Sequence, residues 1–306
     1  MQSKDNKARM LEFVKYHIEG DGECNNTVLK EWVRRRNLTL QERYELAFLF
    51  AVTYCVESAV ICFEKQREYG RLTLTQLQDL KPLLVFQSDR KYMRMKDSFE
   101  RCMEYWYDNN RDAVKFLDSV STGNVINLDK AIKTVSGWVM FGRFSSFLFL
   151  ETLVELTSYE IKNTTIDWKH GDTATSGLLD LFGFHESANR FDKTGKLAMN
   201  TNNMDKMLAY TLQNIAKAGG ITNVTEVETS LCAYRKLYKG SRYNGYYLDR
   251  MLEEIYAMEK QFPAVSKELI DIRLATCNRK YLGEVGGWRG IRKDMKKYYL
   301  QTGEIN

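Results

Sequence analysis

The chain places polar residues at the head of an otherwise apolar segment, FGRFSSFLFLETLVEL, at residues 141–156. Arg143 follows a glycine and comes shortly before Ser145 and Ser146, where a helix packed wholly into a core would carry leucine or alanine. The N-terminus of a helix favours an anion because its N–H groups and its dipole are positive there, and a planar guanidinium suits a phosphate. The two short serines would leave the backbone open to close approach. We therefore expect this helix end to bind an anionic partner through Arg143.

Asp167 is the first candidate for acid–base chemistry. It lies in the polar stretch NTTIDWKHGD (163–172), directly before Trp168. A carboxylate at this place could accept a proton as a general base or stabilise a developing positive charge. The structural alternative is that Asp167 caps the helix that follows, but Asp172 fits that cap better. Asp167 is therefore a candidate catalytic residue, and Trp168 beside it is a candidate binding residue.

Glu228 is the second candidate acid. It lies in the stretch TEVET, residues 225–229. The structural alternative is strong here, because Thr225 and Glu228 match the T-x-x-E pattern of a capping box at the start of a helix. The sequence leaves both roles of Glu228 open.

Basic and aromatic residues gather in the segment RKLYKGSRYNGYYLDR (235–250), which holds five basic side chains against one acid, Asp249. Its candidates for phosphate contact are Arg235, Lys236, Arg242 and Tyr243. Residues 30–37 and 288–299 carry two more basic clusters. Each Lys or Arg placed on a phosphate releases counterions, so three clusters favour a phosphate-rich partner. The alternative for each single cluster is a solvated helix end.

Composition indicates an ordinary globular protein, with 44% hydrophobic and 28% charged residues and a net charge of only +5. The polar N-terminal segment lacks the apolar core of a signal peptide. The longest apolar run, residues 47–63, is interrupted by Glu57 and is shorter than a membrane span, so we expect it to form a central core helix. These features predict a cytoplasmic protein that does not bind a membrane.

Cysteine and histidine patterns argue against a metal enzyme. The six cysteines include no C-x-x-C pair, and the three histidines form no H-E-x-x-H motif. We expect buried, reduced thiols, no protein metal site and no cofactor.

Helical periodicity runs through most of the chain, and the chain has only two prolines. The predicted helices cover residues 4–19, 27–36, 40–69, 73–86, 89–121, 128–135, 142–158, 173–182, 203–218, 226–239, 245–260 and 265–278. Thr39 and Asp89 are predicted helix starts, and Gly240 a helix end. No alternating strand pattern is evident, so the predicted fold class is all-α. The loop at residues 121–129 is the best boundary, which predicts an N-terminal helical bundle at 1–125 and a second region at 126–306. Whether the two regions share one core stays open.

The order of parts in the second region resembles the helix-hairpin-helix DNA glycosylases. The glycine-bearing turn VSGWVMFGR (135–143) leads into a helix, and the polar loop with Asp167 and a further helix follow. A closer resemblance is to the alpha-glutamyl/putrescinyl thymine pyrophosphorylases, which are amino acid:DNA transferases of bacteriophages. Their ET-x-L-C-x-x-K, G-x-Y-x-x-G and D pattern is met at Glu228, Thr229, Leu231, Cys232, Gly240, Gly245 and Asp249. The lysine of the pattern falls on Arg235 or Lys236 and its aromatic residue on Tyr243, and the match spans roughly residues 130–255.

This resemblance implies a glycosylase-like helical fold and a reaction on double-stranded DNA that carries a modified uracil. In such systems a 5-hydroxymethyl-uracil is pyrophosphorylated, and the transferase replaces the pyrophosphate with the amine of an amino acid or a polyamine. It implies that Arg143 holds an anion, that Asp167 and Glu228 do acid–base work, and that the base is swung out of the helix. For a phage protein the location would be the host cytoplasm. A divalent cation at the pyrophosphate stays open.

Two departures from the glycosylase pattern bear on the reaction. Glycosylases that cleave the strand carry a catalytic lysine in the hairpin, where this chain has Gly142, Arg143 and Phe144, so no Schiff-base nucleophile is available there. Asp167 is followed by Trp168 rather than by threonine. Two alternatives to a transferase remain: an excision enzyme that uses Asp167 with water, and a helical DNA-binding protein without catalysis.

Overall fold

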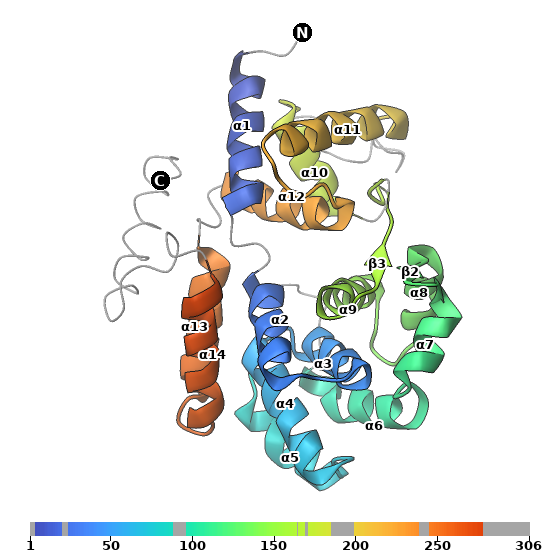
Figure 1. The fold of residues 1–306 in the computed structure, drawn as a ribbon, viewed down its shortest axis with the longest axis vertical. Coiled ribbons are helices and arrows are strands. Elements are labelled where there is room, and N and C mark those ends of the chain that lie inside the picture. Colours follow the sequence, from blue (N-terminus) through green and yellow to red (C-terminus); the bar gives the residue numbers. More distant parts are fainter. Residues whose placement is uncertain are drawn as a thin grey trace. The chain divides into compact units, whose positions relative to one another are not determined.

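The computed structural model describes residues 4–19, 24–87, 96–163, 165–168, 171–184, 199–238 and 245–277. The chain divides into two compact units (Figure 1). Unit 1 takes Met1–Glu23, Asn163–Leu248 and Asn278–Asn306, and unit 2 takes Cys24–Lys162 and Asp249–Cys277. Helices dominate the described residues of both units, which confirms the all-α prediction. The finer expectation of a glycosylase-like topology stays a prediction.

Unit 2 is built of the following elements. They are α2 (Cys24–Arg36), α3 (Leu40–Thr53), α4 (Val56–Tyr69), α5 (Leu74–Leu80), the 3-10 turns η1 (Lys81–Leu83) and η2 (Lys96–Ser98), α6 (Phe99–Asn109), α7 (Ala113–Val120), α8 (Leu128–Val135), α9 (Arg143–Leu156), most of α13 (Tyr246–Met258), α14 (Pro263–Thr276), and the strands β1 (Ser121–Thr122), β2 (Val125–Ile126) and β3 (Glu160–Ile161).

The core of unit 2 is aromatic and lies around α3. Helix α3 packs against α9 and α4, while α14 packs against α2 and α4. Phe48 of α3 stacks on Trp106 of α6, with 3.8 Å between the ring centroids, and Trp138 and Phe149 meet edge to face at 5.1 Å. Offset and edge-to-face aromatic pairs add to the free energy of area burial. The apolar body of α9 is therefore fixed by packing, which holds its N-terminal end in place.

The helix expected over residues 40–69 is wrong in one respect, because it is two helices. Tyr54 lies in the left-handed region at φ 50° and ψ 29° and ends α3. The Thr53 hydroxyl donates to the Leu49 carbonyl at 2.9 Å, and the Thr53 carbonyl accepts the backbone N–H of Gln87 at 3.0 Å. The break therefore depends on a partner far along the chain, which local periodicity does not reveal. Residues on both sides of it are buried, as expected for a core segment.

The helix expected over residues 89–121 is also divided. Its predicted start at Asp89 lies outside the described residues, and α6 begins only at Phe99. After α6 ends at Asn109, the side chain of Asp112 accepts the backbone N–H of Lys115 at 2.9 Å and starts α7 as its N-cap. An N-cap of this kind starts a new helix because it satisfies N–H groups that have no partner within the helix.

The predicted boundary at residues 121–129 lies inside unit 2. Strands β1 and β2 form a hairpin there, with Gly123 in the turn at φ +59°, and β2 pairs in parallel with β3. The chain passes between the compact units at residues 23–24, 162–163, 248–249 and 277–278, and none of these places is at residue 125. This segment is too short to show the alternating pattern of a strand, so the sequence did not reveal it.

Unit 1 contains α1 (Lys4–Glu19), α10 (Asp172–Leu181), α11 (Thr201–Lys217), α12 (Val224–Tyr238) and the first residues of α13. Helices α10 and α12 make its closest packing. A Cβ atom at Gly177 of α10 would lie 2.3 Å from the carbonyl oxygen of Leu231 in α12, so the two backbones approach each other where residue 177 has no side chain. This contact fixes α12, and with it Glu228, relative to the start of α10.

Among the described residues, no helix is both long enough and apolar enough to cross a bilayer.

Candidate functional site

The loop that carries Asp167 is held by an aspartate of α11. The Thr165 hydroxyl donates to Oδ1 of Asp205 at 2.5 Å, and the Trp168 indole N–H donates to the same oxygen at 2.8 Å. Trp168 is 4% exposed and belongs to the apolar core of unit 1. The expectation that Trp168 contacts the DNA is therefore corrected: its ring is packed inside and its N–H is used within the protein. Asp167 itself is half-buried.

Gly171 connects this loop to Glu228. Its N–H donates to the Asp167 carbonyl at 2.7 Å, and a Cβ atom at residue 171 would lie 3.0 Å from that oxygen and 3.3 Å from Oε1 of Glu228. The Glu228 carboxylate therefore lies beside the Asp167 backbone, at the N-terminal end of α10. Helix N-termini stabilise negative charge, so this position suits an ionised carboxylate. The sequence treated Asp167 and Glu228 as separate candidates, and the structure brings the Glu228 carboxylate close to the backbone of the Asp167 loop.

The expected helix caps around these acids are wrong. Helix α10 begins at Asp172 itself, with Gly171 as the N-cap and no side-chain hydrogen bond at the cap, so Asp172 is not the cap. Helix α12 begins at Val224, and the Asn223 side chain accepts the N–H of Thr225 at 2.9 Å. Thr225 therefore lies inside the helix, and its buried hydroxyl oxygen has no hydrogen bond. The capping box of Thr225 with Glu228 does not form, which removes the structural alternative for Glu228.

The basic end of α12 is only partly described. Arg235 is directed toward Asp180 of α10, with 3.5 Å between Nε and Oδ2, and its side chain is 22% exposed. Lys236 is half-buried on the same helix. The candidates Arg242 and Tyr243 and the expected helix end at Gly240 lie outside the described residues. Arg235 is thus a bridge between α10 and α12 in this structure, and its phosphate contact stays a prediction.

The two serines in the first turn of α9 are buried, which the sequence did not predict. Gly142 is the N-cap, and Ser146 donates to the Gly142 carbonyl at 2.8 Å while its oxygen lies 3.0 Å from that of Ser136. Ser145 and Ser146 are 4% and 0% exposed, so both hydroxyls face the protein interior. This burial argues against DNA contacts by the two side chains, and the expected close approach of a partner to the backbone here stays a prediction. Arg143 at the same end is half-buried.

Arg143 lies in unit 2, whereas Asp167 and Glu228 lie in unit 1. The expectation that Arg143 and Asp167 act in one reaction stays a prediction. Asp249, another candidate, lies in the first turn of α13 in unit 2 and is 4% exposed.

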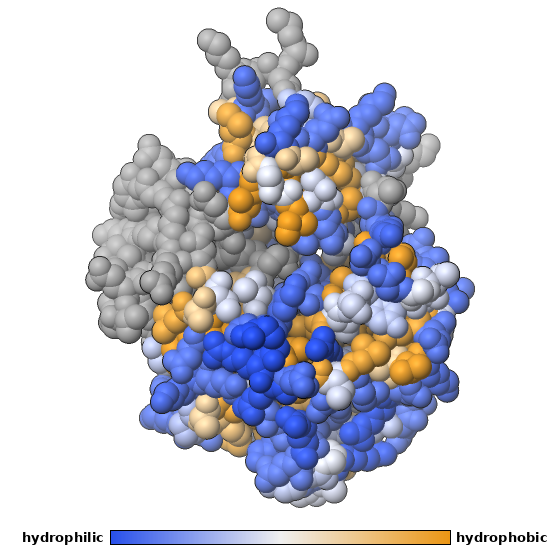
Figure 2. All heavy atoms as spheres, in the orientation of Figure 1, coloured by the Kyte–Doolittle hydropathy of each residue, from blue (hydrophilic) through white to orange (hydrophobic). Residues whose placement is uncertain are grey.

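The basic cluster at residues 30–37 is held by ion pairs. Glu31 binds Arg34 at 2.6 Å and Arg35 at 2.8 Å, and these two hydrogen bonds lower the pKa of Glu31 to about 2. Arg36 binds Glu268 of α14 at 2.6 Å. Hydrophilic side chains accordingly gather over α2 and α4 in Figure 2. This pairing favours the alternative of a helix end balanced by neighbouring acids over a dedicated phosphate site.

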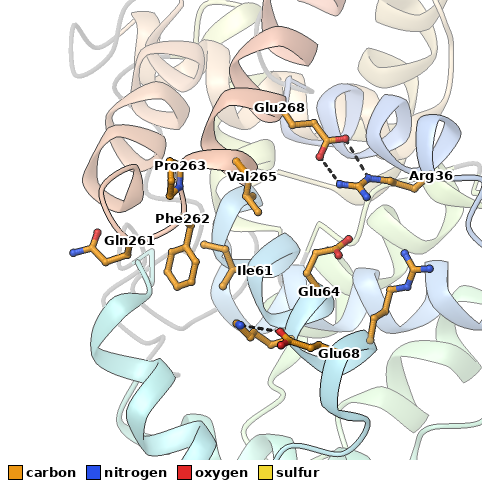
Figure 3. Close-up of a pocket in the computed structure, with 12 residues that line it drawn as sticks. Arg36, Ile61, Glu64, Glu68, Gln261, Phe262, Pro263, Val265 and Glu268 are labelled. Atoms are coloured by element: carbon orange, nitrogen blue, oxygen red, sulfur yellow. Dashed lines mark hydrogen bonds and ion pairs between the residues drawn. The ribbon is translucent and has the colours of Figure 1, made fainter.

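A groove of about 780 Å³ lies beside this cluster in unit 2. Figure 3 shows Arg36 and Glu268 joined across one end, with Ile61 and Phe262 among the apolar lining residues. The cations at its rim are balanced by carboxylates, since Lys65 binds Glu68 at 2.9 Å. The other basic rim residue, Arg67, binds Glu42 at 3.5 Å. The groove thus carries mixed charge rather than the excess of positive charge that a phosphate backbone requires.

The thiols are buried, as expected. Five of the six cysteines are buried, and none of the six forms a disulfide bond in the described structure. Burial raises the pKa of Cys102 to about 12, so this thiol stays protonated and is a poor nucleophile.

Three further residues hold the site, and sequence reasoning missed them. Asp205 lies in an ordinary helical stretch, TNNMDK, whose local pattern gives no sign of its contact with the loop. Gly171 carried a usable signal, because a glycine directly before a helix is a favoured N-cap. Gly177 stands inside a helix, where a glycine is unfavourable and so indicates a close approach of another backbone.

Comparison with known proteins places these residues in a family context. No curated protein matches the chain significantly. The profile of a family described as amino acid:DNA transferase (ADDT) matches residues 32–243, which is more than half of the chain. The matched region contains Arg143, Asp167, Asp205 and Glu228. The chain therefore belongs to the amino acid:DNA transferase family.

Proposed function

We propose that this transferase joins the amine of an amino acid or a polyamine to the exocyclic methylene of a 5-pyrophosphorylmethyl-uracil in DNA and releases pyrophosphate. The observation that carries the proposal is the meeting of the Asp167 loop and the Glu228 carboxylate at the N-terminal end of α10, within one compact unit. Family membership supports the transfer of an amine donor to DNA. The leaving group and the modified base rest on the resemblance described above.

The chemistry needs a proton acceptor. An amine is protonated at neutral pH and cannot attack until it loses a proton, and a carboxylate positioned beside it can take that proton. The amine nitrogen then forms a bond to the methylene carbon while the carbon–oxygen bond breaks and its electron pair leaves with the pyrophosphate. Loss of a second proton from nitrogen gives the neutral adduct. In this proposal Asp167 is the general base, or it stabilises positive charge on the methylene, and Glu228 assists beside it.

The departing pyrophosphate needs a cation. Arg143 begins α9, where the N–H groups of the first turn and the helix dipole add to the guanidinium charge. A bidentate guanidinium stabilises a phosphate oxyanion as its charge develops. We therefore assign Arg143 to the leaving group or to the DNA backbone. The resemblance to the DNA glycosylases implies that the base is swung out of the duplex, which would bring its methylene into the protein.

Product analysis tests this proposal. A duplex with one 5-pyrophosphorylmethyl-uracil is incubated with the protein and, in turn, with glycine, glutamate or putrescine, and the nucleosides are examined by mass spectrometry. The proposal predicts an intact strand with an amine adduct and one pyrophosphate released per adduct. An abasic site would indicate an excision enzyme, and salt-dependent binding with no product would indicate a non-catalytic DNA-binding protein.

A further inference from the structure

We infer that Asp205 is a positioning residue for Asp167, holding the loop from both sides of the reactive carboxylate. The inference rests on the proposed function, since it assigns to Asp205 a role in the same reaction. Asp205 lies on α11, distant from Asp167 in the sequence, and it is not part of any pattern in the sequence.

The contacts of Asp205 bracket Asp167. Thr165 precedes Asp167 by two positions and Trp168 follows it directly, and both donate to Oδ1 of Asp205, at 2.5 and 2.8 Å. A carboxylate oxygen carries two lone pairs and can therefore accept both donors. The two flanking residues are thereby fixed to one atom.

A third contact holds the middle of the loop. The Asp167 carbonyl accepts the N–H of Gly171 at 2.7 Å. Thr165 and Trp168 are thus tied to α11 through their side chains, and the backbone between them is tied at Asp167 to the start of α10. These contacts fix the place in the backbone from which the Asp167 carboxylate extends. A displacement of about 1 Å in a reacting group can cost about 100-fold in rate.

Asp205 itself is on a well-anchored helix. Met204 and Leu208, on either side of it, are each 1% exposed and pack into the core of unit 1. Helix α11 also contacts α1 and α10. The Asp205 carboxylate therefore extends from a well-packed helix to the Asp167 loop. A site built on helices is held in a more precise geometry than a site built on loops alone.

Four variants test the inference. Asp205→Ala removes the acceptor, whereas Asp205→Asn keeps an amide oxygen that can accept both hydrogen bonds. Lys206→Ala, an exposed neighbour on the same helix, is the matched control, and Asp167→Asn reports on the reaction itself. The readouts are kcat and KM for the pyrophosphorylated duplex, and the indole N–H resonance of Trp168 in a proton–nitrogen correlation spectrum, assigned with Trp168→Phe.

The expected result is that Asp205→Ala lowers kcat by about 10- to 100-fold with KM nearly unchanged, and that Asp205→Asn recovers most of that loss. The Trp168 resonance should move in Asp205→Ala and much less in Asp205→Asn, while Lys206→Ala matches the wild type in both readouts. Wild-type kcat in Asp205→Ala, or a Trp168 resonance that does not move, would overturn the inference. If Asp167→Asn retains the wild-type rate, the proposed role of Asp167 fails first; if Asp167→Asn is inactive and Asp205→Ala is not impaired, only the role of Asp205 fails.

Discussion

Oε1 of Glu228 lies 3.3 Å from the point where a Cβ atom on Gly171 would stand, and the Asp167 carbonyl oxygen lies 3.0 Å from the same point. Residue 171 is thus a glycine at the point where the Asp167 loop and α12 come close to each other. The Asp167 oxygen belongs to the backbone and cannot give way easily, whereas the Glu228 side chain can move. A side chain at residue 171 would therefore displace Glu228 from the end of α10.

Gly171→Ala should lower turnover by about 10- to 100-fold, because it shifts Glu228 and crowds the Asp167 backbone. Stability should fall by no more than about 1–3 kcal/mol, the usual cost of overpacking. Single-turnover rates and denaturant unfolding measure the two effects. Gly142→Ala is the matched control for stability, because Gly142 is also an N-cap glycine but has nothing within 4 Å of its Cβ position. Equal unfolding free energies for the two variants, together with full activity of Gly171→Ala, would contradict this prediction.

Gly177→Ala should destabilise the protein by about 1–3 kcal/mol, because the new methyl group would meet the Leu231 carbonyl of α12. In a helix with free space around this position, replacing glycine by alanine would stabilise the protein by about 0.5–1 kcal/mol. The sign of the change in unfolding free energy therefore shows whether the α12 backbone lies against residue 177. Urea unfolding followed by circular dichroism gives the free energy. A gain in stability would show that α10 and α12 are farther apart than described.

Arg143→Ala should weaken binding to modified DNA or slow departure of pyrophosphate while leaving the melting temperature unchanged. If Arg143 contacts a DNA phosphate, the slope of log affinity against log salt should fall by about one unit. Arg101→Ala, an exposed arginine on α6 of the same unit, is the control for a general loss of positive charge. Turnover and affinity equal to those of the wild type would remove Arg143 from the site.

The stability of the protein should depend on pH through the buried carboxyl group of Glu57. This residue is 1% exposed, and burial raises the pKa of its carboxyl to about 8, with a hydrogen bond from Ser266 opposing the shift and the nearby Glu259 and Glu254 adding to it. Between pH 4.5, the ordinary pKa, and about 8 the folded chain keeps a proton that the unfolded chain has lost. Stability contributed by this group is therefore full below pH 4.5 and declines as the pH rises to about 8.

Glu57→Gln is the test of that statement, because glutamine imitates the protonated acid. The variant should have a higher melting temperature than the wild type at pH 8 and a similar one at pH 4.5. Ser266→Ala is the companion variant, since it removes the hydrogen bond to Glu57. If the melting temperatures of Glu57→Gln and the wild type change with pH in the same way across this range, Glu57 is ionised in the folded protein and the prediction is contradicted.

Much of the fold could be predicted from the sequence because helices are local. The helices over residues 4–19 and 128–135 have the predicted bounds, and most others differ from prediction by a few residues. Two of the failures share one cause. The break at Tyr54 depends on Gln87, and the small sheet joins Ile126 to Ile161, so both depend on contacts between distant residues. Periodicity within a short window carries no information about such partners.

The candidate site was predicted less completely. The sequence identified Asp167 and Glu228 by residue type and by resemblance, but it left open for Glu228 a capping-box role that the structure does not contain. It also took Trp168 for a binding residue and expected Ser145 and Ser146 to leave the backbone open, because the burial of a polar atom depends on partners such as Asp205 and Ser136 that lie elsewhere in the chain. Residue type showed which groups could do chemistry, and only the fold showed which of them meet.

The single-turnover rate of Asp167→Asn on a pyrophosphorylated duplex with saturating amine tests the central claim most directly. If the Asp167 carboxylate accepts the proton or stabilises the developing charge, the rate of adduct formation should fall by about 10²- to 10⁴-fold. The affinity for the duplex and the melting temperature should stay at the wild-type values, because asparagine has the same shape. A rate close to that of the wild type would contradict the account.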